Sequence, residues 1–310
     1  MSQGESVIPI LIDCDPGIDD ALALFLAAGS PELRLLGVTT VAGNRPVDIT
    51  ALNACRVLDL AGLDAVPVFA GCARPLAHAD ARCNDVHGLD GLGGVELPAR
   101  RVPSAEHATT FLLRSLLEAP AGTLVIVATG PLSNLALVEI LHPGVLRRAR
   151  SVHVMGGAAF CAGNITPSAE FNFFADPIAA QVVMTSGAKV HLFGLDVTSR
   201  AVMSEAWIES LAQLETRCGT AAHAMLKAYA ALDPLLHDAC PVAHLIEPGL
   251  FAGRRCRVNV EWRPGADEGR SMVETEGGAE AVDADDIVVY TEVDNDALLA
   301  LVGERIARLG

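Results

Sequence analysis

The first two-thirds of the chain alternates between short apolar runs and amphipathic stretches. The apolar run Val7–Leu11 predicts a buried strand, and Ala21–Ala28 after it predicts a helix. Continuous apolar strands separated by helices are typical of a mostly parallel sheet with helices on both faces. The further strands expected are Leu33–Val41, Val66–Ala70, Thr123–Ala128, Ser151–Met155 and Lys189–Leu195, and the helices between them are Val47–Ala61, Glu106–Leu117, Leu132–Leu141 and Pro177–Ser186.

After Thr198 the pattern becomes helical and then ends in strands and a closing helix. Two short strand patterns flank Pro264 and Gly265, which predicts a small β-hairpin. No internal repeat or low-complexity linker divides the chain, so we predict one α/β domain over residues 1–310 with a helical C-terminal portion. The elements expected here are the helices Glu205–Leu214, Thr220–Leu236 and Asp294–Leu309, the strands Arg257–Trp262, Ser271–Glu274 and Ile287–Tyr290, and the exposed acidic loop Glu274–Asp286.

Composition narrows the possible partners. The chain has 38 acidic and 22 basic residues and a formal charge of −16, so no basic surface is expected for binding nucleic acid. No apolar run reaches membrane-spanning length, and Met1–Ser6 lacks the pattern of a signal peptide. The 8 cysteines are scattered without a close pair, as is typical of reduced thiols. We therefore expect a cytoplasmic protein that binds neither nucleic acid nor membrane.

Four carboxylates follow the first predicted strand within eight positions. Asp13 and Asp15 stand at the end of the strand, and Asp19 and Asp20 lie at the start of the next helix. Ligand sites of open α/β sheets lie at this edge. Four negative charges this close repel one another, and either a bound cation or a raised pKa of one carboxylate relieves the repulsion. All the potential ligands are oxygens, which suit Ca²⁺ or Mg²⁺ rather than Zn²⁺. Helix capping would explain Asp19 and Asp20, but it does not explain the pair at the strand end.

Polar residues or glycines also end the other predicted strands, so they are expected along the same edge of the sheet. Asn44, Thr129, Met155 and Asp196 hold these positions. Two long polar segments, His78–Gly94 and Cys161–Pro177, interrupt the alternation of strands and helices and are typical of functional loops.

These motifs together resemble the inosine–uridine-preferring nucleoside hydrolase family, and the resemblance covers nearly the whole chain. The matching blocks, in order, are Asp13–Asp20, Val41–Asn44, Ala128–Asn134, Met155–Gly157, Gly163–Asn164, Glu170–Asn172 and His237–Asp238. The resemblance implies a Rossmann-like fold, hydrolysis of the N-glycosidic bond of ribonucleosides to ribose and free base, and a tightly bound Ca²⁺. It also implies a homodimer or homotetramer.

The resemblance assigns roles residue by residue. It implies that Ca²⁺ is held by Asp15, Asp20, the main-chain carbonyl of Thr129, and Asp238. It implies that the ribose is contacted by Asp19, Asn44, Met155, Asn164, Glu170, Asn172 and Asp238.

The chemistry of the reaction suits these residue types. A ribosyl transition state carries positive charge, which neighbouring carboxylates stabilise, and Asp15 is the expected general base for a water held by Ca²⁺. His237 is expected to protonate the leaving base. His87 could contact the ribose or the base, and Tyr229 is expected on the same helix face as His237, two turns earlier. Core packing or a structural hydrogen bond would also explain each of these three rings.

Two other functions remain open at this stage. A strand that ends in Asp13-Cys14-Asp15 also occurs in haloacid dehalogenase-like, Mg²⁺-dependent phosphatases, for which only Lys189 could meet the phosphate. A non-catalytic nucleoside-binding protein could keep the same fold. The preference for a purine or pyrimidine base is also left open.

Overall fold

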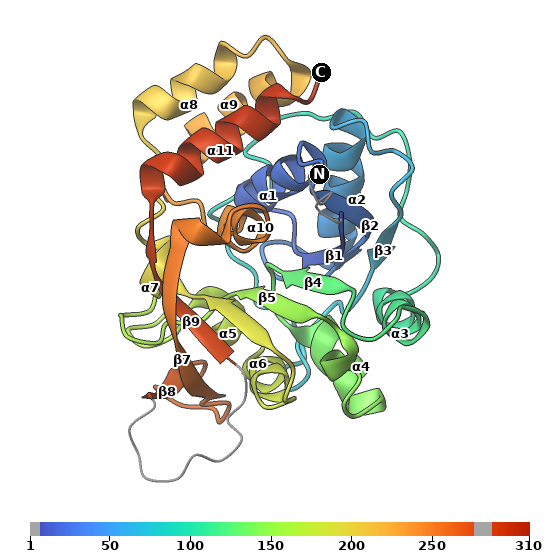
Figure 1. Cartoon of the computed structure of the whole chain (residues 1–310), viewed down its shortest axis with the longest axis vertical. Coiled ribbons are helices and arrows are strands. Elements are labelled where there is room, and N and C mark those ends of the chain that lie inside the picture. The colour runs from blue at the N-terminus through green and yellow to red at the C-terminus, as the bar shows by residue number, and fades with distance from the viewer. Residues whose placement is uncertain (1–6, 276–286) are drawn as a thin grey trace, which may run out of the picture.

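A computed structural model of the chain describes residues 7–275 and 287–310. Within these ranges, one nine-stranded sheet has the order β3-β2-β1-β4-β5-β6-β9-β7-β8 (Figure 1). The strands from β3 to β9 in this order pair in parallel, whereas β7 pairs antiparallel with both β9 and β8. The predicted mostly parallel sheet with a β-hairpin is therefore confirmed. The strands are β1 (Ile8–Cys14), β2 (Leu33–Thr40), β3 (Val68–Ala70), β4 (Val125–Ala128), β5 (Ser151–Met155), β6 (Val190–Phe193), β7 (Phe251–Val260), β8 (Ser271–Thr275) and β9 (Ile287–Val293).

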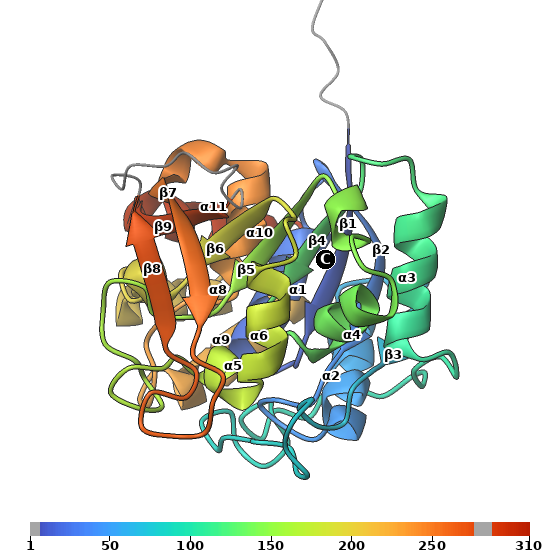
Figure 2. The same cartoon turned by 90° about the horizontal axis from the view of Figure 1, so that it is seen from below.

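Helices cover both faces of the sheet, as the sequence predicts (Figures 1 and 2). Alternate residues of each strand point to opposite faces, so Ile10 and Ile12 enter one apolar core and Leu11 enters the other. The first core is closed by α1 (Ile18–Ala28), α2 (Val47–Leu60), α8 (Glu205–Ala212), α9 (Arg217–Tyr229), α10 (Ala239–Ile246) and α11 (Asn295–Ala307), and the second by α3 (Ala108–Glu118), α4 (Ser133–Leu141) and α6 (Pro177–Met184).

The strand order reverses at β1, which lies between β2 and β4. The chain first moves outward from β1 to β3 and then returns to continue on the other side from β4. The loops after β1 and β4 therefore diverge, and open α/β sheets bind ligands in the crevice that such a divergence leaves. The acidic turn follows β1, so the topology places it at this crevice.

The helix predicted over Thr220–Leu236 is shorter than expected and ends at Tyr229. Pro234 is the physical reason, because a proline disfavours helical backbone in the residue before it, here Asp233. The amides of Leu232 and Asp233 both turn back to the Tyr229 carbonyl. The prediction that Tyr229 and His237 share a helix face is therefore wrong.

Several elements escaped the sequence pattern. The short helix α5 (Phe171–Ala175) lies inside the predicted loop Cys161–Pro177, and α7 (Leu195–Thr198) replaces the expected end of a strand. The whole of α10 was missed, and β7 begins six residues before Arg257. The structure also has two 3₁₀ turns, η1 (Leu146–Arg148) and η2 (Pro248–Leu250).

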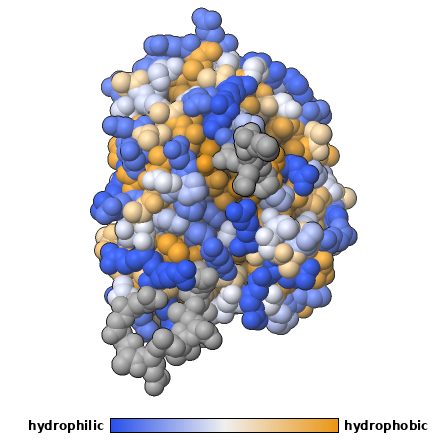
Figure 3. Space-filling view, in the orientation of Figure 1, coloured by the Kyte–Doolittle hydropathy of each residue, from blue (hydrophilic) through white to orange (hydrophobic). Residues whose placement is uncertain are grey.

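The predicted acidic loop Glu274–Asp286 lies mostly outside the described residues, and the single domain over 1–310 stays a prediction. Among the described residues, no helix has both the length and the apolar character needed to cross a membrane. On the face shown in Figure 3, hydrophilic residues are spread among hydrophobic ones.

Candidate active site

A pocket opens where the sequence analysis placed the functional edge of the sheet. All residues predicted to contact substrate line it, together with Thr129 and His237, whereas Asp15 and Asp20 do not. We call this cavity the acidic pocket. It is lined by Asp19, Asn44, Asn84, Val86, His87, Thr129, Met155, Asn164, Ile165, Glu170, Phe171, Asn172, Tyr229, Asp233, His237 and Asp238.

Asp15 follows β1 and is almost completely buried, with 1% of its surface exposed. The main-chain N–H of Asn44 donates to its Oδ2 at 2.6 Å, whereas its Oδ1 has no hydrogen-bond partner. Gly43 and Gly130 enclose the carboxylate so tightly that a Cβ on either would collide with it. The loops after β2 and β4 therefore fix one carboxylate oxygen and leave the other without a partner.

Asp20 is both a helix cap and part of the acidic group. Its Oδ2 accepts the N–H of Gly17 at 2.9 Å, which is the capping contact considered from the sequence. Its Oδ1 accepts the hydroxyl of Thr129 at 2.7 Å, and this bond joins the turn after β1 to the loop after β4. Asp13 points elsewhere: its Oδ1 accepts from Thr39 and Asn134, and burial raises its pKa to about 7.

Asp19, Asp20 and Asp238 bring carboxylate oxygens within 4.8 Å of one another. Asp238 comes from the residue before α10, more than 200 positions away in the chain. The sequence analysis named Asp20 and Asp238 as metal ligands together with Asp15. The structure groups Asp19 with them instead, although the sequence analysis gave that residue to the ribose.

Burial is the main cause of the raised pKa values in this group. It raises the pKa of Asp15, and the negative charges of Asp20 and Asp19 add to the effect. The pKa of Asp238 is also raised by burial first, and then by Asp19, Asp20 and Asp15. A bound cation would remove this repulsion.

The donor set fits a hard divalent cation. The carboxylate oxygens are buried, the Oδ1 of Asp15 lacks a partner, and neither lysine nor arginine lines the acidic pocket. Carboxylate and carbonyl oxygens are the ligands that Ca²⁺ and Mg²⁺ prefer. The Thr129 carbonyl, also named from the sequence, lies at the same place and accepts the side-chain amide of Asn172 at 2.7 Å.

Glu170 and Asn172 shape the opposite wall of the acidic pocket. Glu170 is the N-cap of α5, and its carboxylate accepts the N–H groups of Gly157, Asn172 and Phe173. Burial raises the pKa of Glu170 while these three N–H groups oppose the shift. The side chain of Asn164 accepts the N–H of Phe171 at 3.0 Å, which holds the loop before α5 against the wall.

His87 and Tyr229 stack with ring centroids 5.0 Å apart. The N–H of Ile18 donates to His87 Nδ1 at 3.1 Å, so Nε2 carries the proton of the neutral ring. Nε2 lies 3.8 Å from Asp19. Burial lowers the pKa of His87 to about 4, which keeps the ring neutral at pH 7.

His237 is held between two side chains. Its Nδ1 lies 2.8 Å from the hydroxyl of Thr198, and its Nε2 lies 3.2 Å from the carboxylate of Asp233. Burial alone would lower the pKa of His237, but Asp233, Asp19 and Glu170 outweigh it, so the pKa is raised. His237 and Tyr229 meet in the acidic pocket through the loop after α9, not through a shared helix.

The sequence analysis missed Asn84 and Asp233. Asn84 donates to the side-chain oxygen of Asn44 at 2.8 Å, and it lies in the same polar segment as His87. Asp233 precedes His237 by four positions and adjoins a proline. The place of Asn84 in the pocket could have been inferred from the polar segment that it shares with His87. The place of Asp233 could not, because it depends on a loop that the sequence pattern assigned to a helix.

Comparisons with known proteins agree with this geometry. Residues 10–300 match the inosine-uridine preferring nucleoside hydrolase family. The chain is 40% identical over 276 residues to a pyrimidine-specific ribonucleoside hydrolase, RihA, of Photobacterium profundum, covering 86% of this chain and 88% of that protein. It is 35% identical over 274 residues to an inosine-uridine preferring nucleoside hydrolase of Leishmania major, covering 86% and 87%. A purine-preferring ribonucleoside hydrolase from Gardnerella vaginalis has a similar structure, with a TM-score of 0.90 and 30% identity over 97% of this chain and 98% of that one.

Proposed function

This chain belongs to the inosine-uridine preferring nucleoside hydrolase family and hydrolyses the N-glycosidic bond of ribonucleosides, and we propose that it does so in the acidic pocket with Asp15 as the general base. One observation carries the assignment of the site. Carboxylates from two distant parts of the chain converge beside a wall of amide and carboxylate groups suited to a sugar diol.

We propose that the metal is Ca²⁺. Asp15, Asp20, Asp238 and the Thr129 carbonyl would hold it, and Asp19 lies close enough to Asp20 and Asp238 to join them. When bound, the cation supplies positive charge that acidifies water and offsets the carboxylates. Ca²⁺ accepts oxygen ligands in variable number and geometry, whereas Mg²⁺ demands near-ideal octahedral geometry, so a group of several carboxylates and a carbonyl favours Ca²⁺.

Asp15 is suited to accept a proton because its two oxygens differ. Oδ2 is fixed by the N–H of Asn44, whereas Oδ1 has no partner and can take the proton of the attacking water. Burial raises the affinity of this carboxylate for a proton, in the direction that a general base needs. The rigid enclosure by Gly43 and Gly130 keeps the oxygen in place.

The wall of the acidic pocket would bind ribose and stabilise the transition state. Asp19, Asn44, Asn164, Glu170 and Asn172 offer acceptors and donors for sugar hydroxyls. Their carboxylates favour the positive charge that develops on the ribosyl group. Met155 adds an apolar contact at the end of β5.

His237 is the proposed proton donor to the departing base. It lines the acidic pocket, and Asp233 and Thr198 hold its ring from two sides. His87 and Tyr229 form an adjacent stacked wall, which could contact the base through ring faces. The relatives named above differ in their stated base preference, so the base is best decided by experiment.

A panel of substrates tests the proposed function. Purified protein in Ca²⁺ is incubated with uridine, cytidine, inosine and adenosine, and with p-nitrophenyl phosphate as a generic phosphate ester. We expect equal amounts of ribose and free base from at least one ribonucleoside and no phosphate release, because no lysine or arginine lines the acidic pocket. Tight nucleoside binding without ribose release would contradict catalysis and support a binding protein.

We also propose that the chain forms a homodimer or homotetramer, as its sequence resemblance implies. Light scattering after size-exclusion chromatography measures the mass directly. A mass of 32.3 kDa, that of one chain, would contradict this proposal.

A further inference from the structure

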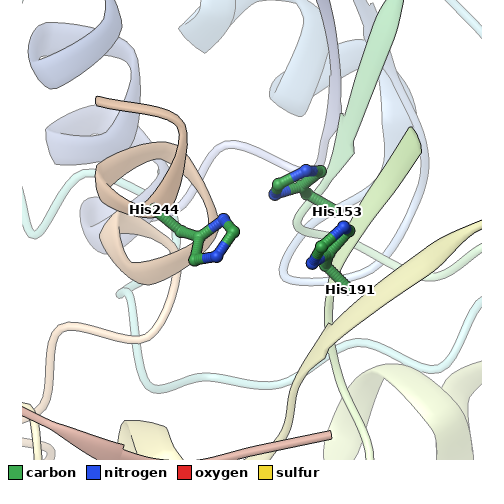
Figure 4. A group of neighbouring side chains, drawn as sticks. All are labelled: His153, His191 and His244. Carbon is green, nitrogen blue, oxygen red and sulfur yellow. The ribbon is translucent and has the colours of Figure 1, made fainter. Parts of the chain in front are cut away.

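Three histidines form a second group of potential metal ligands inside the fold. His153 on β5 and His191 on β6 are partners in the parallel register, and His244 lies in the last turn of α10 (Figure 4). Figure 4 shows the ring of His244, on the helix, facing the rings of His153 and His191, which stack on each other from the two strands with centroids 4.5 Å apart. One ligand nitrogen from each ring lies within 4.8 Å of the others. We call these three residues the histidine cluster.

Hydroxyl groups hold one nitrogen of each ring. Ser151 Oγ lies 3.1 Å from His153 Nε2, and Tyr290 Oη lies 2.9 Å from His191 Nδ1 and 2.7 Å from His244 Nε2. The Tyr290 hydroxyl has one proton, so it accepts from at least one of the two rings, and the opposite nitrogen of that ring carries the lone pair. Metal-binding histidines are typically oriented in this way, through the nitrogen that does not bind the metal.

Two of the opposite nitrogens are buried and have no hydrogen-bond partner. They are Nδ1 of His153 and Nδ1 of His244, in side chains that are 2% and 9% exposed. The carbonyl of Pro241 lies near the His153 ring and favours its charged form, but its contact does not have the distance and angle of a hydrogen bond to Nδ1. A buried polar atom without a partner is destabilising, so a ligand that bonded to both atoms would relieve this cost.

The electrostatics keep the rings in the form that binds metal. Burial lowers the pKa of His244 to about 3 and that of His153 well below 6.5, and the neighbouring histidines add to both shifts. Both imidazoles are therefore neutral at pH 7, as metal ligands must be. Lys189 opposes a cation, but its side chain is exposed and its charge is screened by solvent.

We propose that the histidine cluster binds Zn²⁺, through His153 Nδ1, His244 Nδ1 and a nitrogen of His191, at a site separate from the acidic pocket. Imidazole nitrogens suit Zn²⁺, whereas Ca²⁺ and Mg²⁺ prefer oxygen. Three histidines leave a fourth tetrahedral position for water. Zn–N bonds of about 2.0–2.1 Å place tetrahedral nitrogens about 3.4 Å apart, so binding requires the ligand nitrogens to approach one another and the stacked rings of His153 and His191 to rotate toward the ion.

The ion would act on the placement of α10. This helix begins directly after Asp238 and ends near His244, and it packs on β5 and β6. A metal bond from His244 to both strands fixes the far end of the helix that positions Asp238. The role of the Zn²⁺ is therefore structural, and its detection does not depend on ribose release.

Cobalt is a suitable probe because tetrahedral Co²⁺ absorbs strongly in the visible region, whereas Co²⁺ bound by oxygen in an octahedral site absorbs weakly. Chelator-treated protein is saturated with Ca²⁺ and titrated with Co²⁺. We expect intense bands that saturate at one Co²⁺ per chain and disappear when Zn²⁺ is added. Absence of the intense bands would overturn the proposal.

Variants identify the ligands. His153→Gln and His244→Gln should each abolish the bands, and Tyr290→Phe should weaken Co²⁺ binding about 10–100-fold by freeing two rings. Exposed His142, next to α4, provides the control His142→Gln, and Asp20→Asn controls for the acidic pocket; both should keep the bands.

Bands that persist in both histidine variants would overturn the assignment, as would their loss in His142→Gln. Circular dichroism verifies that each variant folds. If a glutamine variant fails to fold, the Tyr290→Phe titration decides, and unchanged affinity would contradict the proposal.

Discussion

The acidic pocket and the histidine cluster are both groups of potential metal ligands, but they lie at different places in the sheet. The acidic pocket draws its carboxylates from the turns that follow β1 and precede α10, where loops diverge and water has access. The histidine cluster uses residues inside β5 and β6, two positions before Met155 in the first case. The carboxylates therefore lie in loops and at a helix start beyond the strand ends, whereas two of the three histidines lie within strands and the third on α10.

This difference has an energetic consequence. Burial is the main cause of the raised pKa values of the carboxylates, and their mutual repulsion adds to it. Buried imidazoles simply remain neutral. Loss of metal should therefore disturb the acidic pocket more than the histidine cluster, and strand ends can hold reactive charge that strand interiors cannot.

The largest expected effect concerns the substrate itself. The polar wall of the acidic pocket is proposed to form hydrogen bonds with the ribose hydroxyls. 2′-Deoxyuridine lacks the 2′-hydroxyl, so buried polar groups would lose their partner, and its kcat/KM should be about 10⁴–10⁵-fold below that of uridine. His142→Gln is the control and should show the same ratio, since His142 is exposed and does not line the acidic pocket. Comparable rates of ribose and deoxyribose release would contradict this role.

Replacement of the proposed general base should have the next largest effect. Asp15→Asn keeps the shape of the side chain but removes its basicity, so kcat should fall by about 10²–10⁴-fold. Initial rates of ribose release, with circular dichroism to verify folding, measure this. Asp59→Asn is a matched control, because Asp59 is also buried but pairs with Arg101 away from the acidic pocket. A slow Asp59→Asn variant or a fast Asp15→Asn variant would contradict the assignment.

Asp238→Asn tests how Ca²⁺ binding supports the fold. Ca²⁺ at about 100 times its Kd should stabilise the wild type by about 2.7 kcal/mol, and the variant should lose most of this gain. Calorimetry with and without Ca²⁺ measures the shift in Tm, and elemental analysis measures retained calcium. An unchanged calcium-dependent shift would show that Asp238 is not a ligand.

The smallest effect is expected at the partner of His237. Asp233→Asn weakens a charge-assisted hydrogen bond that orients the ring, so kcat should fall about 10-fold with a smaller change in KM. Glu209→Gln is the matched control, because Glu209 makes the same kind of contact with His223 at the surface. A change confined to KM would indicate that Asp233 acts on binding and not on the leaving group.

The two regions also differ in what the sequence could predict. The acidic turn could be predicted from the sequence because four carboxylates lie close together directly after an apolar run. The ends of parallel strands also meet at one edge of the sheet, which gives the turn its place in the fold. The members of the histidine cluster are separated by 38 residues (153 to 191) and 53 residues (191 to 244). They meet only through the register of β5 with β6 and through α10, a helix that the pattern did not reveal.

Other misses have local causes. The pattern extended α9 through Leu236 because the apolar spacing continues, but Pro234 ends the helix at Tyr229. The resulting loop is what places Asp233 beside His237. A helix as short as α5 contains too few residues for an apolar pattern to repeat, so the sequence does not reveal it. The capping hydrogen bonds of Glu170 that define its start are visible only in the structure.

The most direct measurement of the central claim is ribose release by chelator-treated protein before and after Ca²⁺ alone is added back. We expect negligible release without Ca²⁺, recovery in the wild type with one ribose formed per base, and no recovery in Asp15→Asn. Full release in the absence of any divalent cation, or equal recovery in Asp15→Asn, would contradict the claim that the acidic pocket and its metal perform the hydrolysis.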